Sequence, residues 1–336
     1  MRLVTFKNAA FPDSPRIGIH TGALQSGSIL DWAEGMKALG QPERVAQNDL
    51  AFDMIKWIET SEQTLPLAQR LVEAHQAGKL THHKSLVLNE SECTLLSPIP
   101  RPLSMRDGYA FRQHVEAARR NRGVPMIPEF DDFPVFYFTN HLAVTGPGEL
   151  AVQKLARDKL DFELEVAIVI GKSGRNISAA KADDHIFGYM IMNDWSARAL
   201  QIEEMKLNLG PAKGKDFATS LGPYLVTRDE LHTYSEKGPN GERHNLKMKA
   251  FVNGVQVSNG NLKDMSWTFA QIVERASYGV TLQPGEVIGS GTVGTGCFLE
   301  LNGSKITDNQ WLKPGDLVVM EVEHLGRLEN KILAAD

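Results

Sequence analysis

The sequence predicts a strand-rich α+β fold in which a small N-terminal α+β domain, residues 1–95, precedes a larger domain, residues 96–336. Most segments after residue 96 are short apolar runs bounded by Gly, Pro or Asn. The few helix-like segments there do not alternate with the strands, so parallel βαβ winding is not supported. A proline-rich joint at residues 95–103 separates the two parts.

The first part is expected to combine one early strand with helices. Residues 1–6 form a short apolar run that is typical of a strand. Helices are expected near residues 29–39 and 58–77. These few elements are enough for a small α+β unit.

The second part is expected to consist mainly of strands. Helices are expected near His114, after Asp194 and at residues 267–276. The glycine-rich stretch 289–296 is expected to be an active-site loop between strands, since no helix-forming segment follows it. The predicted strands are residues 162–170, 186–192, 222–227, 247–253, 286–290, 297–301 and 317–323, with turns at 253–254, 302–303 and 314–315.

Two carboxylates stand within a run that otherwise predicts a buried strand. Glu163 and Glu165 are two residues apart, so in a strand they share one face, with Leu164 and Val166 on the other. A buried carboxylate without a partner is unfavourable, and a like-charged neighbour makes it more so. The pair is therefore expected to take up protons or to bind a cation, and oxygen ligands favour Mg2+, Ca2+ or Mn2+. The alternative is an edge strand whose Glu face is solvated.

Two further segments supply candidate site residues. The apolar run 186–192 leads to Asp194, where a strand gives way to a helix, and site residues often project from such ends. Asp107 precedes a helical stretch in which His114 lies about two turns further on. Taken singly, Asp107 is typical of a helix N-cap and His114 of a structural histidine.

The order of three motifs gives a stronger indication. Asp-x-Tyr-(x)4-His begins at Asp107, Glu-x-Glu at Glu163 and Asn-Asp-Trp-Ser-Ala-Arg at Asn193. In this combination the sequence resembles the fumarylacetoacetate hydrolase family over about residues 100–330, and its motifs are closest to the fumarylacetoacetase branch. The resemblance implies a mixed β-sandwich roll for the catalytic domain and a homodimer.

The resemblance also implies roles for individual residues. It implies metal ligation by four carboxylates, namely Asp107, Glu163, Glu165 and Asp194. It implies catalytic roles for a general base, for the carboxylate that holds it and for a lysine, which are His114, Glu300 and Lys215. It implies substrate contacts at Tyr109, Tyr137, Arg198, Gln201 and Thr292. The chain departs from the fumarylacetoacetase pattern at two positions, where Met205 replaces a tyrosine and Gly123 an arginine.

These residue types fit one reaction on a small diketo acid. The cation, for which we expect Mg2+ with Ca2+ or Mn2+ as alternatives, polarises a carbonyl of the chelated substrate. His114 deprotonates water, Glu300 stabilises the imidazolium, and Lys215 hydrogen-bonds the departing enolate. We therefore expect hydrolysis of a carbon–carbon bond in a fumarylacetoacetate- or acylpyruvate-like acid, in aromatic or amino acid catabolism.

Two alternatives stay open. The first is another reaction through the same metal-bound enolate, such as decarboxylation, isomerisation (tautomerisation) or dehydration of an oxo acid. The pairing of His114 with Glu300 favours hydrolysis, because water must be activated. The second is a non-catalytic binding protein stabilised by a structural cation, against which the presence of both His114 and Lys215 argues.

Composition and charge exclude other classes of protein. The chain has 336 residues, 42% hydrophobic and 23% charged, which is ample for a main core and a smaller domain. The net charge of −5 and the single basic cluster at residues 119–122 argue against a nucleic-acid partner. No signal peptide and no apolar run of membrane-spanning length is present in the sequence, so no membrane association is expected.

The two cysteines indicate a reducing compartment. Cys93 and Cys297 are far apart and have no metal-binding or redox spacing. We therefore expect a cytoplasmic protein with reduced thiols. A nucleophilic role for Cys297 is disfavoured, because no activating histidine is close to it in the sequence.

Overall fold

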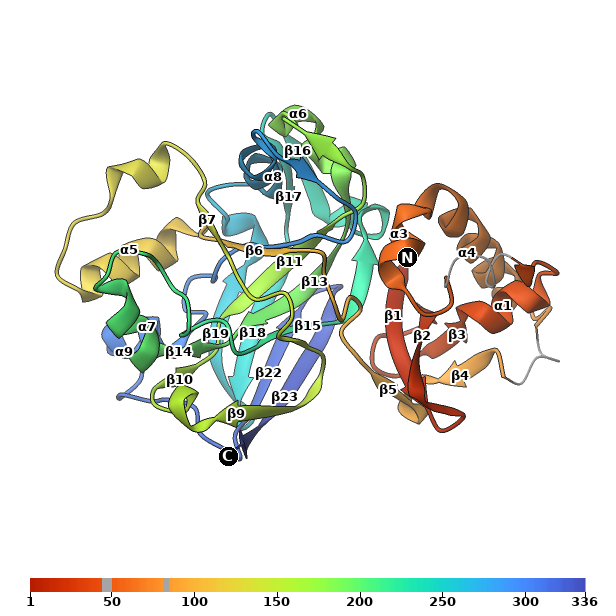
Figure 1. The fold of residues 1–336 in the computed structure, drawn as a ribbon, viewed down its shortest axis with the longest axis horizontal. Helices are drawn as coiled ribbons and strands as arrows, with labels where there is room; N and C mark the ends of the chain where they lie inside the picture. The colour runs from red at the N-terminus through yellow and green to blue at the C-terminus, as the bar shows by residue number, and fades with distance from the viewer. Residues whose placement is uncertain (44–49, 81–84, 336) are drawn as a thin grey trace.

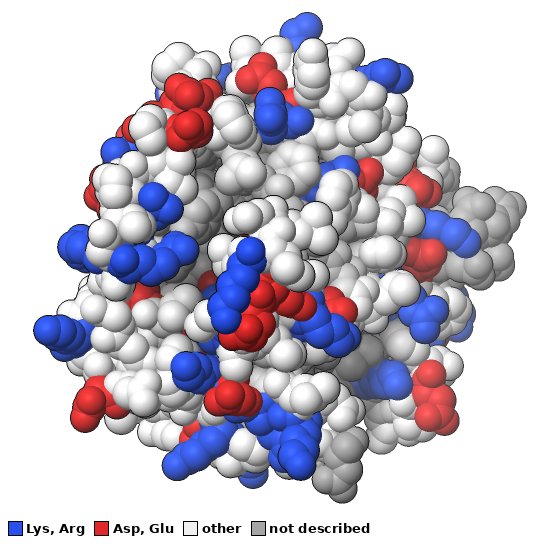
Figure 2. All heavy atoms as spheres, turned by 60° about the vertical axis from the view of Figure 1, so that its left-hand side comes forward, with Lys and Arg blue, Asp and Glu red and all other residues white. Residues whose placement is uncertain are grey.

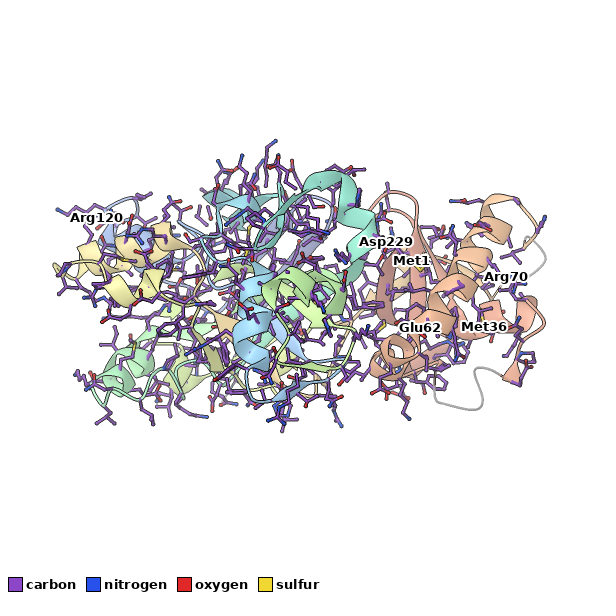
Figure 3. The ribbon with its side chains drawn as sticks, turned by 90° about the horizontal axis from the view of Figure 1, so that it is seen from above. Met1, Met36, Glu62, Arg70, Arg120 and Asp229 are labelled. Carbon is purple, nitrogen blue, oxygen red and sulfur yellow. The ribbon has the colours of Figure 1, made fainter. Side chains whose placement is uncertain are left out.

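The fold is an α+β arrangement rich in strands, which confirms the predicted class (Figure 1). The computed structural model describes residues 1–43, 50–80 and 85–335. The molecule is elongated (Figure 3). Met36, Glu62 and Arg70 of the N-terminal part lie toward one end, and Arg120 lies at the other.

One large mixed sheet runs through most of the molecule. Its order is β4-β3-β2-β1-β15-β13-β11-β21-β6-β7, with β5 paired to β1 and β8 to β15. The β21–β6 and β15–β8 pairs are parallel. The strands are β1 (Arg2–Asn8), β2 (Phe11–Thr21), β3 (Ser28–Asp31), β4 (Val87–Asn89), β5 (Cys93–Leu95), β6 (Met105–Gly108), β7 (Phe136–Phe138), β8 (Val144–Thr145), β11 (Leu164–Ile170), β13 (Ile186–Asp194), β15 (Thr219–Thr227) and β21 (Val287–Gly289).

Strand β11 separates two hydrophobic cores, because its side chains alternate between the faces of the sheet. Val166 and Ile168 pack in one buried cluster, whereas Ala167 and Val169 pack in the other. Every residue of β11 is buried, as a nearly continuous apolar run predicts. Glu165 is two residues from Ala167, so its side chain lies on the same face of the sheet as Ala167. Val166 lies on the other face.

A second sheet covers the first of these cores. It has the order β19-β18-β22-β23-β9, and Met248 and Met320 from its strands pack in the same cluster as Val166. The first core therefore lies between two packed sheets. The strands are β9 (Gly148–Gln153), β18 (Lys247–Val252), β19 (Val255–Asn261), β22 (Leu317–Val322) and β23 (Gly326–Ala335).

The N-terminal strands extend the large sheet, because β1 pairs with β15 and places Leu3 opposite Leu225. Among the described residues, the helices that accompany these strands are α1 (Trp32–Ala38), α3 (Met54–Glu59) and α4 (Ser61–Gln76). They pack on the second core, where the rings of Trp32 and Trp57 meet edge to face at 5.5 Å. The expected helix at 29–39 is partly wrong, since its first residues form β3 and Asp31 caps α1.

Shorter elements complete the fold. The predicted helix at 267–276 is confirmed as α8, which begins at a capping box formed by Thr268 and Gln271. The other helices are α5 (Arg112–Asn121), α6 (Ala179–Ala182), α7 (Arg198–Met205), α8 (Phe269–Ser277) and α9 (Phe298–Gly303). The short strands are β10 (Leu160–Asp161), β12 (Gly174–Arg175), β14 (Ser196–Ala197), β16 (Ser235–Gly238), β17 (Gly241–His244) and β20 (Thr281–Leu282).

One predicted strand is wrong: residues 297–301 lie mostly in helix α9, which also contains the expected turn at 302–303. The loop 289–296 therefore leads from a strand into a helix. The reason is a long-range cap, because Asp161 accepts hydrogen bonds from the backbone N–H groups of Phe298 and Leu299. That carboxylate satisfies two N–H groups that the first turn of a helix leaves without an intrahelical partner.

The surface carries charges of both signs. Figure 2 shows Lys and Arg side chains interspersed with Asp and Glu over one face of the molecule. In the described part of the chain, no helix has the length and apolar character that crossing a bilayer requires.

Candidate active site

Four acidic side chains that are distant in the sequence meet at the large sheet. Asp107 lies on β6, Glu163 directly before β11, Glu165 on β11 and Asp194 at the end of β13. One carboxylate oxygen from each lies within 4.8 Å of those of the other three. All four residues are at least 94% buried. The alternative of a solvated Glu face is therefore wrong.

The strand order explains why these residues meet. Strand β11 lies between β13 and β21, and β21 pairs with β6 so that Gly289 is opposite Asp107. A side chain at Gly289 would not fit, because its Cβ would lie 2.5 Å from Asp107 Oδ1 and 3.0 Å from Glu165 Oε2. The glycine thus lets two carboxylates approach across a strand.

Glu163 and Asp194 are the members of the cluster that have cationic partners. Lys215 donates from its ammonium to Glu163 and, at 2.7 Å, to Asp194 Oδ2. Arg198 Nη2 donates to Glu163 Oε1 at 2.7 Å. Burial alone would raise the pKa of Glu163, but the charges of Lys215 and Arg198 hold that pKa below its usual value.

Asp107 and Glu165 form no ion pair with a lysine or arginine in the described part of the chain. Among the described residues they accept hydrogen bonds from the Gly291 N–H, at 3.1 Å each, and Glu165 also accepts one from the Thr292 hydroxyl at 3.4 Å. Burial, followed by the charge of Asp194, raises the pKa of Asp107 to about 7. Burial, followed by the charge of Asp107, raises the pKa of Glu165 well above its usual value. This half of the cluster is therefore short of positive charge.

The donor set fits the divalent cation that the sequence predicts. All the ligand atoms are carboxylate oxygens, which suit Mg2+, Mn2+ or Ca2+ better than softer metals. Asp194 Oδ1 is buried and, within the described structure, has no hydrogen-bond partner. In the described structure, the ion pairs of the four carboxylates come from the Lys215 ammonium, which contacts Glu163 and Asp194, and from the Arg198 guanidinium, which Glu163 shares with Asp161, so negative charge is in excess.

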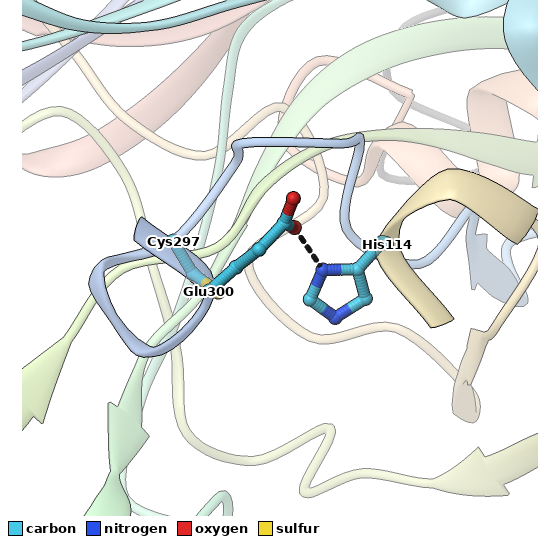
Figure 4. Close-up of side chains that lie close together, drawn as sticks. All are labelled: His114, Cys297 and Glu300. Atoms are coloured by element: carbon cyan, nitrogen blue, oxygen red, sulfur yellow. Dashed lines mark hydrogen bonds and ion pairs between the residues drawn. The ribbon is translucent and has the colours of Figure 1, made fainter. Parts of the chain in front are cut away.

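A histidine–carboxylate pair lies close to this cluster. His114 on α5 and Glu300 on α9 are both buried, and His114 Nδ1 lies 2.6 Å from Glu300 Oε2 (Figure 4). The Thr295 N–H donates to the other oxygen of Glu300 at 3.0 Å, which fixes the carboxylate. A positive charge on the His114 ring would lower the pKa of Glu163, so the imidazole is near enough to influence the cluster. The other ring nitrogen of His114, Nε2, takes no part in the hydrogen bond to Glu300.

Cys297 is the third member of this group, and the sequence does not place it there. A donor atom from each of His114, Cys297 and Glu300 lies within 4.8 Å of the other two. No histidine is close to Cys297 in the sequence, but α5 brings His114 close to it in the structure. Burial, followed by the charge of Asp161, raises the pKa of the Cys297 thiol well above its usual value, so the sulfur is not a ready nucleophile.

The structure places the predicted substrate contacts around these groups. The Tyr137 hydroxyl donates to Asp194, and the half-buried Tyr109 ring stands edge-on to His114 at 5.9 Å. The Thr292 hydroxyl bonds Glu165, as described above. Arg198 is almost completely buried, and its three nitrogens donate to Asp161, Gln201 and Glu163. Arg198 and Gln201 are therefore engaged with the protein itself.

Asp161 is a site residue that the sequence analysis missed. It is completely buried and accepts hydrogen bonds from three backbone N–H groups and from Arg198 Nε at 2.9 Å. Through Arg198 it positions Glu163, and through the start of α9 it positions Glu300. The sequence does contain a signal for Asp161, because acidic residues stand at alternate positions, Asp161, Glu163 and Glu165.

Replacing Asp161 with asparagine is expected to weaken both halves of the site. The amide places an N–H₂ group against N–H donors, so either Arg198 or α9 loses its partner. We expect a fall of about 10- to 100-fold in metal affinity, as for other residues that hold ligands in place. Calorimetric titration with Mn2+ measures this effect. The control is Asp158→Asn in the exposed turn nearby, which should bind Mn2+ like the wild type.

Comparison with known proteins shows which family the chain belongs to. The family model described as fumarylacetoacetate (FAA) hydrolase, C-terminal, matches residues 104–333. The chain belongs to the fumarylacetoacetate hydrolase family. The family predicted from the motifs is thereby confirmed, and with it an enzyme rather than a non-catalytic binding protein.

Two proteins of similar sequence and one solved structure of similar fold are informative. The oxaloacetate tautomerase YisK of Bacillus subtilis (strain 168) is 31% identical, over 74% of this chain and 76% of its own. The human protein named oxaloacetate tautomerase FAHD2A, mitochondrial, is 30% identical, over 99% of this chain and 92% of its own. The maleylpyruvate hydrolase of Sphingobium sp. SYK-6, solved with manganese(II) and pyruvate, has a TM-score of 0.68 at 20% identity, with full coverage of both chains, and shows the shared fold.

The names of these relatives bear on the predicted branch of the family and on the predicted location in the cell. The two sequence relatives are tautomerases by name, so they do not support the expected closeness to fumarylacetoacetase. The human relative is named as mitochondrial, so the cytoplasmic location stays a prediction.

Proposed function

We propose that this protein interconverts the keto and enol forms of a small 2-oxo acid of the oxaloacetate kind, with a divalent cation at the four carboxylates. The observation that carries the proposal is the buried His114–Glu300 pair beside that cluster. Tautomerisation moves one proton between carbon and oxygen, which needs an acid–base group next to a place that favours enolate charge. The names of two relatives at 30% and 31% identity support this reaction.

Each of the chain's own groups has a defined task in this reaction. A bound divalent cation supplies the positive charge that favours an enolate over a ketone. His114 takes the proton from the carbon beside the keto group through the ring nitrogen that does not face Glu300. Glu300 keeps the proton on Nδ1 and stabilises the imidazolium. Lys215 holds an ammonium at Glu163 and Asp194, beside the developing negative charge.

Hydrolysis of a carbon–carbon bond in a diketo acid is the second candidate. The same His114–Glu300 pair favours it, because an imidazole held by a carboxylate can also deprotonate water. The two reactions differ in what must enter the site. Hydrolysis consumes a water molecule and breaks a bond, whereas tautomerisation returns every atom of the substrate.

The experiment is to add enol-oxaloacetate to the protein with Mg2+ or Mn2+ and to follow the loss of the enol's ultraviolet absorbance. We expect ketonisation faster than with buffer and metal ion alone, with no pyruvate formed, and a return to that background after a chelator is added. A parallel assay offers an acylpyruvate and measures the released acids. Background rates with oxaloacetate together with cleavage of the acylpyruvate would instead establish a hydrolase.

A further inference from the structure

We propose that His114, Cys297 and Glu300 form a second metal site, one that takes a soft or borderline divalent ion such as Zn2+ and thereby inhibits the enzyme. This inference concerns the pair that moves the proton. The binding site rests on geometry alone, and only its inhibitory consequence depends on the proposed function. The two parts are therefore tested by different measurements.

The geometry brings three different donors to one place. An imidazole nitrogen, a thiol sulfur and a carboxylate oxygen lie within 4.8 Å of one another, and all three residues are at least 93% buried. Figure 4 shows Cys297 and Glu300 at the start of α9, with the ring of His114 facing the Glu300 carboxylate from α5. Zinc sites commonly combine three protein ligands of these kinds with a fourth position that water occupies. Small side-chain rotations can bring donors at this spacing to zinc-binding distances.

The chemistry of the two centres selects different ions. The carboxylate cluster offers only oxygen, which suits hard cations, whereas a set of nitrogen, sulfur and oxygen suits Zn2+ or Co2+. A thiol binds as thiolate, so the ion must displace one proton from Cys297 to solvent as the metal–sulfur bond forms. The charge of the ion must offset the burial and the charge of Asp161, which raise the pKa of this thiol, while the charge of Arg198 and the Glu300 N–H act in the opposite direction.

Occupation of this site removes the acid–base pair from catalysis. A neutral imidazole has a single ring-nitrogen lone pair, and the ion takes it together with an oxygen of Glu300, the partner of His114 at 2.6 Å. His114 can then no longer carry the substrate proton. Zn2+ should therefore inhibit the enzyme while Mg2+ or Mn2+ still occupies the four carboxylates.

Cobalt spectroscopy tests the binding site without any assay of activity. The protein is saturated with Mg2+ and titrated with Co2+, and the charge-transfer band of a cobalt–thiolate bond is recorded in the near ultraviolet. We expect the band in the wild type and in Cys93→Ser, and its loss in Cys297→Ser and in Cys297→Ala. The chain has only these two cysteines, so Cys93→Ser is a matched control. Absence of the band in the wild type, or its persistence without Cys297, would overturn the site.

Inhibition tests the consequence. With Mg2+ in excess, the Zn2+ concentration that halves each variant's own rate should rise by about 10-fold or more in Cys297→Ser, and should not change in Cys93→Ser. Equal inhibition of all three proteins would place the zinc at the carboxylates and refute the inhibitory role. If the cobalt band appears but oxaloacetate is not tautomerised, the metal site stands and the proposed function fails.

Discussion

Glu165→Gln is expected to lower the affinity for Mg2+ or Mn2+ by more than about 100-fold, which exceeds the usual effect of removing a residue that only supports a ligand. Glu165 and Asp107 form the half of the cluster that has no cationic partner among the described residues, so a bound ion compensates them most. The same change should stabilise the metal-free protein. Burial and the charge of Asp107 raise the pKa of Glu165 in the folded state, so this carboxyl group lowers stability once the pH is above its unfolded-state pKa, whereas a neutral amide does not.

Both effects can be measured on one variant. Calorimetric titration gives the metal affinity, and chemical denaturation in a chelator should show an increase of at least about 1 kcal/mol in the free energy of unfolding. Glu286→Gln is the control, because it removes a buried glutamate that pairs with Arg106 outside the cluster. It should lower stability and leave metal affinity unchanged. Unaltered metal binding in Glu165→Gln would remove Glu165 from the ligand set.

His114→Ala is expected to lose about 100-fold or more of the turnover rate while it binds the metal ion as the wild type does, since removal of a general acid–base group has an effect of this size. The reason is that His114 touches Glu300 rather than the carboxylate ligands. Steady-state rates at saturating Mn2+, together with the same calorimetric titration, measure the two properties separately.

Glu300→Gln provides a graded comparison for His114→Ala. The amide keeps its carbonyl oxygen as an acceptor for Nδ1 but no longer stabilises an imidazolium by charge, so its turnover should lie between that of the wild type and that of His114→Ala. A His114→Ala enzyme with the wild-type rate would assign the proton transfer to another group.

The central strands of the fold could be predicted from the sequence because their signal is local. The run 164–170 is apolar at every position except Glu165, and residues 186–192 of β13 form a second apolar run. Alternation also predicts that Glu165 shares a face with Ala167. By contrast, residues 297–301 are a short, mostly apolar run that predicts a strand, but residues from 298 onward form a helix, because Asp161 supplies the cap from a distant part of the chain.

The site was predictable in composition but not in all its contacts. The four carboxylates could be named because ordered motifs carry them. What the motifs could not indicate is that Gly289 lets Asp107 approach Glu165, or that α5 brings His114 to Cys297. Such contacts depend on which strands and helices become neighbours, and no periodicity within one segment specifies that.

The most direct test of the account is a Mn2+ titration of the wild-type protein by calorimetry at several pH values. We predict one tightly bound ion per chain, with an affinity that rises between about pH 6 and 8, because protons compete for Asp107, whose pKa is raised to about 7 in the metal-free protein. Binding should release protons at neutral pH. No saturable binding, or an affinity that does not depend on pH over that range, would contradict a cation held by these four carboxylates.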